Sequence, residues 1–205
     1  MCLNFKGVVL TVEEQVHEDV LKLKQGLGEL PEPIVKPFLI VMSGLPGTGK
    51  SYFSRKLTER LSCVRLESDE LRKLLFPRPT YAADENQRLF SALHRLTEEL
   101  LQRNIPVLLD ATNLIERHRE QLYHIAERLG AKLILVRVEA PPEVVRQRLE
   151  ARMSRTDRED SSEADFSVYQ RMRRRVQQIR RRHFVVDTSR DITPVLEKIV
   201  REVRR

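Results

Sequence analysis

Two patterns of hydrophobic and polar residues alternate along most of this chain. Short runs that suit strands cover residues 38–42, 64–67, 105–109, 132–138 and 184–186. Between them, apolar residues recur every three or four positions, as on one face of a helix. These helical segments cover 52–61, 84–103, 116–129, 142–153 and a last stretch from Thr193. Because strands alternate with helices, the pattern predicts an α/β fold with a parallel sheet covered on both faces.

Residues 1–37 stand outside this alternation and predict an N-terminal helical extension to a main domain at 38–205. Residues 11–14 read Thr-Val-Glu-Glu, which is a capping-box signature. An apolar stripe follows at Val12, Val16, Val20, Leu23 and Leu27. Gly28 can end this helix, and three prolines between 31 and 37 then form a stiff connector. We expect the extension to pack against the main domain, and we see nothing catalytic in it.

The most informative segment lies between the first strand and the next helix. It fits G-x-x-x-x-G-K-[ST], the phosphate-binding loop of nucleoside-triphosphate enzymes. The expected nucleotide-binding residues are Gly44, Leu45, Pro46, Gly47, Thr48, Gly49, Lys50, Ser51 and, directly after the motif, Tyr52. A glycine-rich turn with a chance Lys-Ser pair is the alternative, and the flanking strand and helix argue against it.

Each residue type in this loop suits a triphosphate. The glycines let successive backbone N–H groups point inward and remove Cβ atoms that would collide with phosphate. The helix that follows adds its unpaired N–H groups and the positive end of its dipole. Lys50 can reach the β- and γ-phosphates, and the hydroxyl of Ser51 is a ligand for Mg²⁺. The expected cofactors are therefore ATP and Mg²⁺.

Polar residues at two further strand ends form a second group of candidates, because ligands bind at the carboxyl edge of a parallel sheet. Asp69 and Arg72 follow the second strand and share a helix face. Asp69 can take a proton from an acceptor hydroxyl, and Arg72 can hold an acceptor phosphate or orient Asp69. Asp110 and Asn113 follow the third strand, where Asp110 can hold Mg²⁺ through water or bind the acceptor.

Structural roles remain open for these four residues. Ser68 or Asp69 can be a helix N-cap, with Arg72 as a surface charge. Asp110 can cap the helix that follows it, and Asn113 carries the weaker functional signal.

Arginines on the helix at 142–153 and just beyond it are a third group. Arg148 and Arg152 lie four residues apart on one face, and Arg146 and Arg155 flank them. Such arginines can clamp the transferring γ-phosphoryl group and neutralise charge in the transition state. The polar stretch 154–163 suits a mobile lid. The alternative is a solvated helix face, with Arg146 and Arg155 the more ordinary surface residues.

Composition narrows the class of protein. The chain has 205 residues and a net charge of +7, and residues 171–182 hold seven arginines and no acid. This run can bind a polyanion, form a solvated helix or belong to a phosphate-gripping lid, which we expect at roughly 148–180. No apolar run is long enough to span a membrane, and no signal segment is recognisable. Cys2 and Cys63 fit neither a disulfide framework nor a metal pair, so we expect a cytoplasmic protein of unknown oligomeric state.

Together the phosphate loop, Asp69-x-x-Arg72, the Asp110-x-x-Asn113 strand end and the paired arginines resemble the P-loop kinases related to the kinase domain of phage polynucleotide kinase. Zeta-toxin-like and small-metabolite kinases belong to the same group. The resemblance covers about residues 38–190. It implies a three-layer P-loop sandwich with sheet order 2-3-1-4-5, Asp69 as general base, Arg72 as an acceptor contact, and Arg148 and Arg152 in the lid. More weakly, it implies that the loop at 187–189 lies near the adenine.

The resemblance defines the chemistry better than the acceptor. Tyr52 departs from the family, where Thr often follows the loop serine, and no attached phosphatase motif occurs. The leading hypothesis is ATP-dependent phosphoryl transfer to a hydroxyl, first a polynucleotide 5′-hydroxyl because of the basic run. A small-metabolite or antibiotic kinase is the alternative. An ATP-hydrolysing or ATP-binding switch is a second alternative, against which the absence of Asn-Lys-x-Asp and of a Glu after Asp110 counts.

Overall fold

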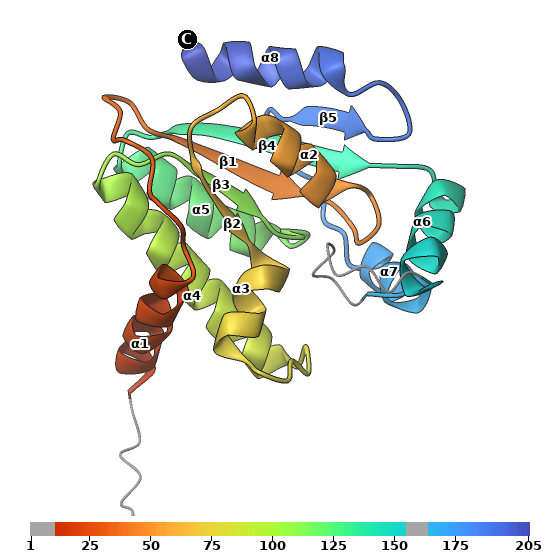
Figure 1. The fold of residues 1–205 in the computed structure, drawn as a ribbon, viewed down its shortest axis with the longest axis horizontal. Helices are drawn as coiled ribbons and strands as arrows, with labels where there is room; N and C mark the ends of the chain where they lie inside the picture. Colours follow the sequence, from red (N-terminus) through yellow and green to blue (C-terminus); the bar gives the residue numbers. More distant parts are fainter. Residues whose placement is uncertain (1–10, 155–163) are drawn as a thin grey trace, which may run out of the picture.

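A five-stranded parallel sheet forms the centre of the molecule (Figure 1). The computed structural model describes residues 11–154 and 164–205. The strands lie in the order β2-β3-β1-β4-β5. They are β1 (Phe38–Ser43), β2 (Val64–Glu67), β3 (Val107–Asp110), β4 (Lys132–Glu139) and β5 (Phe184–Asp187). Both the α/β class and the sheet order expected from the sequence are confirmed.

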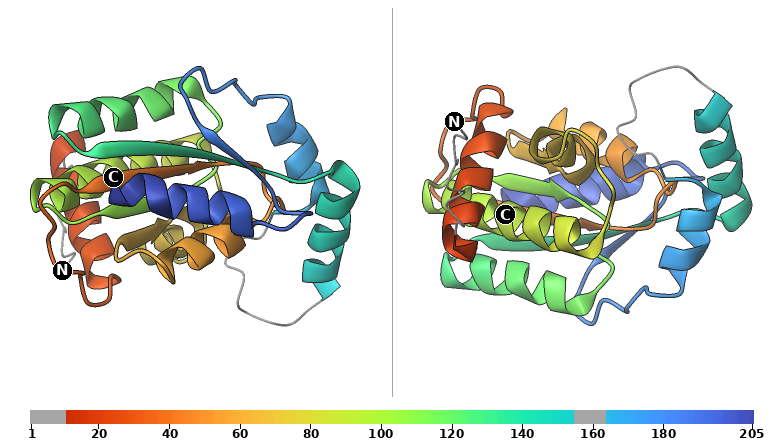
Figure 2. Two further views of the ribbon diagram at one scale, coloured as in Figure 1. Left: turned by 90° about the horizontal axis from the view of Figure 1, so that it is seen from above. Right: turned by 90° about the horizontal axis from the view of Figure 1, so that it is seen from below.

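Helices cover both faces of this sheet, which gives three layers (Figure 2). They are α1 (Val12–Gln25), α2 (Lys50–Thr58), α3 (Ser68–Leu75), α4 (Ala83–Gln102), α5 (Glu116–Arg128), α6 (Pro142–Ser154), α7 (Phe166–Arg173) and α8 (Thr193–Arg204). Within β1, Leu39 and Val41 pack toward α4 and α5, whereas Ile40 and Met42 pack toward α2 and α8. Alternate side chains of a buried strand point to opposite faces, so a continuous apolar run serves two cores.

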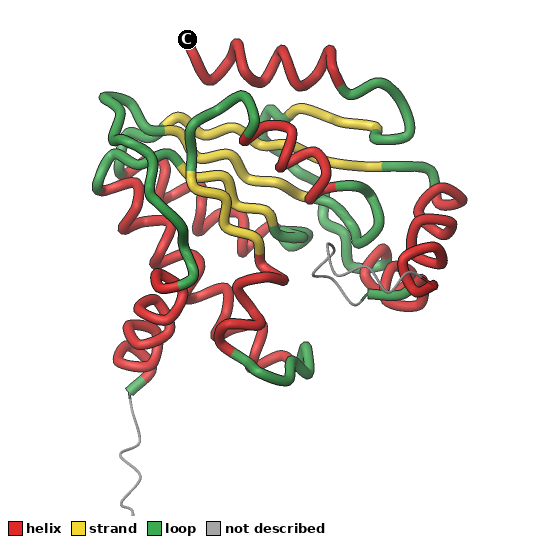
Figure 3. The backbone as a smooth tube through the Cα atoms, in the orientation of Figure 1, coloured by secondary structure: helices red, strands yellow, loops and turns green. Residues whose placement is uncertain are grey.

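Strand register brings the polar strand ends to one edge. Glu67, the last residue of β2, pairs in register with Asp110, the last residue of β3. The phosphate loop follows β1, the neighbour of β3 on its other side. In Figure 3 these strands end at the side of the molecule where α3, α6 and α7 lie. The carboxyl edge of the sheet therefore carries the candidate residues, as expected.

The N-terminal helix α1 is part of the main core. The side chain of Thr11 and that of Glu14 form the predicted capping box, and Val20 and Leu23 are buried in the same cluster as residues of α4 and the sheet. Val12, in contrast, is 81% exposed. The helix ends at Gly26 and not at Gly28 as predicted, because the N–H of Gly26 already bonds back to the carbonyls of residues 23 and 24.

The arginine-rich run 171–182 is mostly not helical. Its first three residues end α7, and residues 176–182 have no regular structure, so the solvated-helix interpretation is wrong for most of the run. The sequence patterns did not predict helix α7. Asp165 caps it by accepting a hydrogen bond from the N–H of Val168 at 2.8 Å, and Tyr169 packs on Val145 and Leu149 of α6.

Residues 155–163, and with them Arg155 and most of the expected mobile lid segment, lie outside the described residues. Among the helices within the described ranges, none is long and apolar enough to cross a membrane.

Candidate active site

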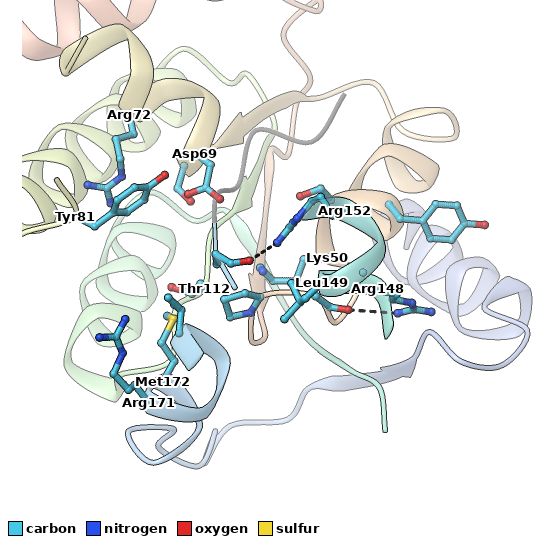
Figure 4. Close-up of a pocket in the computed structure, with 18 of the residues that line it drawn as sticks. Lys50, Asp69, Arg72, Tyr81, Thr112, Arg148, Leu149, Arg152, Arg171 and Met172 are labelled. Atoms are coloured by element: carbon cyan, nitrogen blue, oxygen red, sulfur yellow. Dashed lines mark hydrogen bonds between the residues drawn. The ribbon is translucent and has the colours of Figure 1, made fainter. Parts of the chain in front are cut away.

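A cavity of about 1260 Å³ opens at the carboxyl edge of the sheet. Its lining comes from the phosphate loop, from α3, from the segment 80–90, and from α6 and α7. Figure 4 shows Asp69, Arg72 and Tyr81 toward one side of this space and Arg148, Leu149 and Arg152 toward the other, with Lys50 near the latter group. The cavity thus brings together residues from all three sequence-predicted groups.

The glycines of the phosphate loop are needed for both conformation and space. Gly47 and Gly49 have φ values of +77° and +85°, in the left-handed region that favours glycine. A Cβ on Gly47 would lie 2.9 Å from side-chain atoms of Val145 and Leu149 in α6, and one on Gly49 would lie 3.0 Å from the hydroxyl oxygen of Thr188. The loop is therefore packed closely against α6 and the residue that follows β5.

Hydrogen bonds of other loop residues hold the loop in its conformation. The hydroxyl of Thr48 donates to the carbonyl of Leu45 at 2.7 Å, and the N–H of Gly44 donates to the carbonyl of Thr112 at 3.1 Å. Lys50 begins α2, faces the cavity, and its Nζ lies 3.4 Å from the carbonyl of Leu45. Pro46, Ser51 and the half-exposed Tyr52 also line the cavity.

A cluster of oxygen atoms lies behind the loop. The hydroxyl of Ser51 donates to a carboxylate oxygen of Glu67 at 3.1 Å. The neighbouring carboxylate, Asp110, accepts a hydrogen bond of 2.6 Å from the hydroxyl of Ser54. The guanidinium of Arg65 pairs with Glu67 and lies 3.6 Å from Asp110. Burial raises the pKa of Asp110, an effect that Lys50 and the Ser54 hydrogen bond oppose.

Glu67 is a member of this cluster that sequence reasoning missed. Its signal was available, because it is the last residue of a predicted strand and so lies at the carboxyl edge of the sheet. In the structure it pairs in register with Asp110. These oxygens fit Mg²⁺, which is held by one or two protein carboxylates or hydroxyls together with phosphates. No three acidic, His or Cys side chains that could hold a metal ion converge among the described residues.

Asp69 and Arg72 both face the cavity from α3. The N-cap position of α3 is Glu67, so neither Ser68 nor Asp69 is the cap that the structural alternative required. Arg72 is not a surface charge either, because it is only 4% exposed. Its Nη2 donates to the Oδ1 of Asn86 at 2.6 Å, and its guanidinium lies 4.7 Å from the ring centre of Tyr81.

Asp110 and Asn113, the candidates at the end of the third strand, lie outside the described cavity lining. Asn113 is buried, and its amide donates to the carbonyl of Met42 at 2.8 Å, so it ties the end of β1 to the following loop. Neither Asp110 nor Asn113 belongs to the described cavity lining, whereas Thr112 does. The structure thus does not bring the side chain of Asn113 into the cavity lining. Asp110 does not cap the next helix, because the N-cap of α5 is Ile115.

Arg148 and Arg152, the paired arginines of α6, both line the cavity but bind different partners. Arg148 donates to the hydroxyl of Thr188 at 2.8 Å and to its carbonyl at 2.9 Å, while that hydroxyl donates to the carbonyl of Thr48 at 2.7 Å. Arg148 therefore links α6 to the phosphate loop. Arg152 lines the cavity and donates to the carbonyl of Ala164 at 2.7 Å. Arg146 pairs instead with an exposed glutamate of its own helix.

Comparison with known proteins gives the family. Residues 39–179 match the family model AAA_33, which is described as an AAA domain, and this range is more than half of the chain. The chain belongs to this AAA domain family. The matched range begins in β1 and ends after α7, so it contains the phosphate loop, Asp69, Arg72 and both α6 arginines of this AAA domain protein.

One relative and two solved structures are also similar to this chain. L-seryl-tRNA(Sec) kinase of Methanococcus maripaludis is 25% identical over 108 residues, which are 50% of this chain and 41% of that protein. The chain thus spans less than half the length of this relative. Kti12 of Chaetomium thermophilum, solved with ADP-AlF3, superposes with a TM-score of 0.64 and 23% identity over 80% of this chain and 98% of that one.

The APS kinase CysC of Mycobacterium tuberculosis, solved with AMPPNP and APS, superposes with a TM-score of 0.62. It is 18% identical, over 85% of this chain and all of that one. This AAA domain protein therefore shares its fold with both of these nucleotide-bound structures. The finer resemblance, to the kinase domain of phage polynucleotide kinase, stays a prediction.

Proposed function

We propose that this protein transfers the γ-phosphoryl group of ATP to a hydroxyl group of an anionic acceptor, with the 5′-hydroxyl of a polynucleotide as the first candidate. The observation that carries the proposal is the shared cavity. It joins a phosphate loop with its lysine to an acidic side chain, Asp69, and to arginines on both walls. A carboxylate that lines the same cavity as a phosphate loop is what a kinase needs, whereas a simple nucleotide-binding module does not need one.

The loop and α2 hold the nucleotide in this proposal. Backbone N–H groups of the loop and the start of α2 bind the phosphates, and Lys50 lies against the β- and γ-phosphates. The hydroxyl of Ser51 would hold Mg²⁺, and the carboxylates of Glu67 and Asp110 behind it would complete the site. When bound, Mg²⁺ neutralises charge that develops on the phosphate oxygens.

Asp69 acts as the general base on the acceptor side. Its carboxylate takes the proton of the acceptor hydroxyl as that oxygen forms a bond to the γ-phosphorus. The bond from the γ-phosphorus to its bridging oxygen breaks at the same time, and ADP leaves with the electron pair. Arg152 and the loop-bound Arg148 lie on the opposite wall, where they stabilise the negative charge of the transferring group.

The charge of the cavity favours an acceptor that is itself anionic. Six arginines and Lys50 line it, against Asp69 as the one acidic side chain in the described lining. The arginines are Arg55, Arg72, Arg148, Arg152, Arg171 and Arg175. A bound Mg–ATP leaves much of this positive charge unneutralised, and a phosphate-bearing acceptor would use it. Arg171 and Arg175 also belong to the basic run 171–182, whose residues 176–182 are not part of the described cavity lining.

The test is a transfer assay with γ-labelled ATP on three acceptors: a 5′-hydroxyl oligonucleotide, a nucleoside 3′-monophosphate and a neutral sugar. We expect label on the first two. Asp69→Asn should lower kcat by about 10²- to 10⁴-fold. Asp84→Asn, a matched change at an exposed acid at the start of α4, should leave kcat unchanged. Transfer to the sugar alone would identify a metabolite kinase, and transfer to water alone would identify an ATPase; either result refutes the proposed acceptor class.

Salt dependence separates a polynucleotide from a small phosphorylated acceptor. Binding of a polynucleotide releases counterions, so its affinity should fall steeply as salt rises. An oligonucleotide whose affinity hardly changes between low and physiological salt would contradict the role given to the arginines.

A further inference from the structure

The turn before α4 holds an aromatic ring in a strained position at the cavity. Tyr81 has a φ of +58°, a left-handed conformation that non-glycine residues rarely adopt. Such strain persists only where the surroundings enforce it, and it is found mainly at functional sites. Tyr81 is 39% exposed as a residue, and it belongs to none of the hydrophobic clusters found among the described residues. Packing of the core therefore does not explain the conformation.

Glu85 enforces the turn from the first turn of α4. Its carboxylate accepts hydrogen bonds from the N–H of Thr80 at 3.0 Å, from the hydroxyl of Thr80 at 2.9 Å and from the N–H of Tyr81 at 2.9 Å. These bonds lower the pKa of Glu85 even though desolvation opposes them, so its carboxyl is ionised at neutral pH. Hydrogen bonds to a charged acceptor are stronger than those between neutral groups, which suits a residue that must hold a strained backbone.

Asn86 joins the same turn to Arg72. Its amide group donates to the carbonyl of Tyr81 at 3.0 Å, while its Oδ1 accepts the 2.6 Å hydrogen bond from Arg72. The guanidinium of Arg72 lies under the Tyr81 ring, 4.7 Å from its centre, and is 3.6 Å from Glu85. Nε of Arg72 is buried without a hydrogen-bond partner among the described residues. Two adjacent residues of α4 thus fix both the ring and the cation beside it.

The ring and Asp69 share the acceptor wall of the cavity. Arg72 lies one helical turn after Asp69 on α3, and both residues line the cavity together with Tyr81 (Figure 4). Asn86 and Phe90 of α4 also line it. A group that stacks on Tyr81 therefore lies on the same wall as the carboxylate that is proposed to accept the proton.

We propose that Tyr81 is a stacking subsite for a planar ring of the acceptor, a nucleobase, and that Glu85 and Asn86 are positioning residues that hold it there. This inference rests on the proposed function, since it assigns the acceptor wall of that site. An aromatic face accepts any base, because every base has a π surface, and the guanidinium behind the ring adds positive charge to the same wall. The subsite therefore selects acceptors with a base over those without one and does not read sequence.

The experiment measures binding, so that it does not depend on catalysis. Fluorescence anisotropy gives the Kd of two labelled 5′-hydroxyl oligonucleotides, one with a normal 5′ nucleotide and one with an abasic 5′ residue, in the presence of a non-hydrolysable ATP analogue. Tyr81→Gly removes the ring and relieves the strain at φ +58°, so the turn keeps its shape. Tyr81→Phe keeps the ring and is the matched control.

We expect Tyr81→Gly to reduce the preference for the base-ended oligonucleotide by roughly 5- to 150-fold, with Tyr81→Phe within about twofold of the native protein. Glu85→Ala should cause a similar loss, and the double variant Tyr81→Gly/Glu85→Ala should lose no more than Tyr81→Gly alone. An unchanged preference in Tyr81→Gly overturns the subsite. A further loss in the double variant overturns the positioning role of Glu85.

The two experiments distinguish a failure of the stacking subsite from a failure of the proposed transfer reaction. If no acceptor becomes labelled by γ-labelled ATP but Tyr81→Gly still weakens base-ended binding, the transfer reaction is refuted and the subsite is retained. If the native protein transfers phosphate but does not distinguish base-ended from abasic oligonucleotides, the subsite is refuted and the transfer reaction is retained.

Discussion

Replacing Thr188 with valine removes one hydroxyl while keeping the shape of the side chain, and it tests how α6 is coupled to the phosphate loop. That hydroxyl donates to the carbonyl of Thr48 and accepts from Arg148. A neutral hydrogen bond contributes about 1 kcal/mol and one to a charged group about 1.5–3 kcal/mol. Because Arg148 keeps its 2.9 Å bond to the carbonyl of residue 188, we take the lower part of this range. The expected loss of unfolding free energy is about 2–3 kcal/mol.

For a protein of this size, such a loss lowers Tm by about 5–10 °C, which differential scanning fluorimetry measures. The same scan with a non-hydrolysable ATP analogue reports nucleotide binding, because a ligand raises Tm only as far as it binds the folded state. We expect a smaller increase for Thr188→Val than for the native protein, since one freed group, the carbonyl of Thr48, belongs to the phosphate loop and the other, Arg148, lines the same cavity. Thr188→Ser keeps the hydroxyl and is the control. A valine variant with native Tm and a native ligand-induced increase would refute the coupling.

Two further predictions concern stability. Arg88→Ala should destabilise the fold by about 3 kcal/mol, because Asp19 would stay buried without the guanidinium that now donates to it at 2.5 and 2.6 Å. Chemical denaturation measures this loss. The control is Arg95→Ala, on the exposed face of the same helix, which should cost far less. His94→Leu should flatten the pH dependence of Tm between pH 4.5 and 7. Burial and, to a lesser extent, His118 lower the pKa of His94 to about 4, so the native state binds fewer protons than the unfolded state, and stability falls as pH drops below about 6.5. An unchanged slope would contradict the buried neutral imidazole.

Local sequence patterns were sufficient to predict most of the fold. The apolar runs fix the strands, because residues buried on both faces of a parallel sheet must be apolar at every position. Predicted and observed strand boundaries accordingly differ by two residues at most. The phosphate loop is equally local, since eight consecutive residues carry its conformation and its chemistry. Helix α7 was missed because the signal for it is a single capping aspartate, Asp165, beside a run of arginines.

The rest of the site depends on contacts between distant residues, which single-sequence patterns do not encode. Thr188 meets Thr48 across 140 positions, and Glu67 meets Ser51 only because β2 ends beside α2. Tyr81 lies in an exposed turn, where nothing in the sequence indicates that its ring lies over Arg72. Individual residue types were therefore predictable, whereas the partners that orient them were not.

The two walls of the cavity are held by different parts of the fold. The nucleotide wall is fixed by α6 and Thr188, which bond directly to the phosphate loop. The acceptor wall is fixed by the start of α4, which holds Arg72 and the turn at Tyr81. Substitutions on one wall should thus change affinity for one substrate and not the other.

The N-terminal helix gives the acceptor wall its outer support. Arg88 lies two residues after Asn86 on α4 and is the residue that binds Asp19 of α1, while its guanidinium also lies 5.2 Å from the ring centre of Phe76 at the end of α3. A Cβ on Gly26, just after α1, would lie 2.2 Å from a methyl group of Leu74 in α3. Helix α1 therefore contacts both helices that form the acceptor wall. Among the described residues, the ion pairs of α1 go to α4, from Asp19 to Arg88 and from Lys24 to Glu99. Loosening α1 should therefore weaken binding of the acceptor before it weakens binding of ATP.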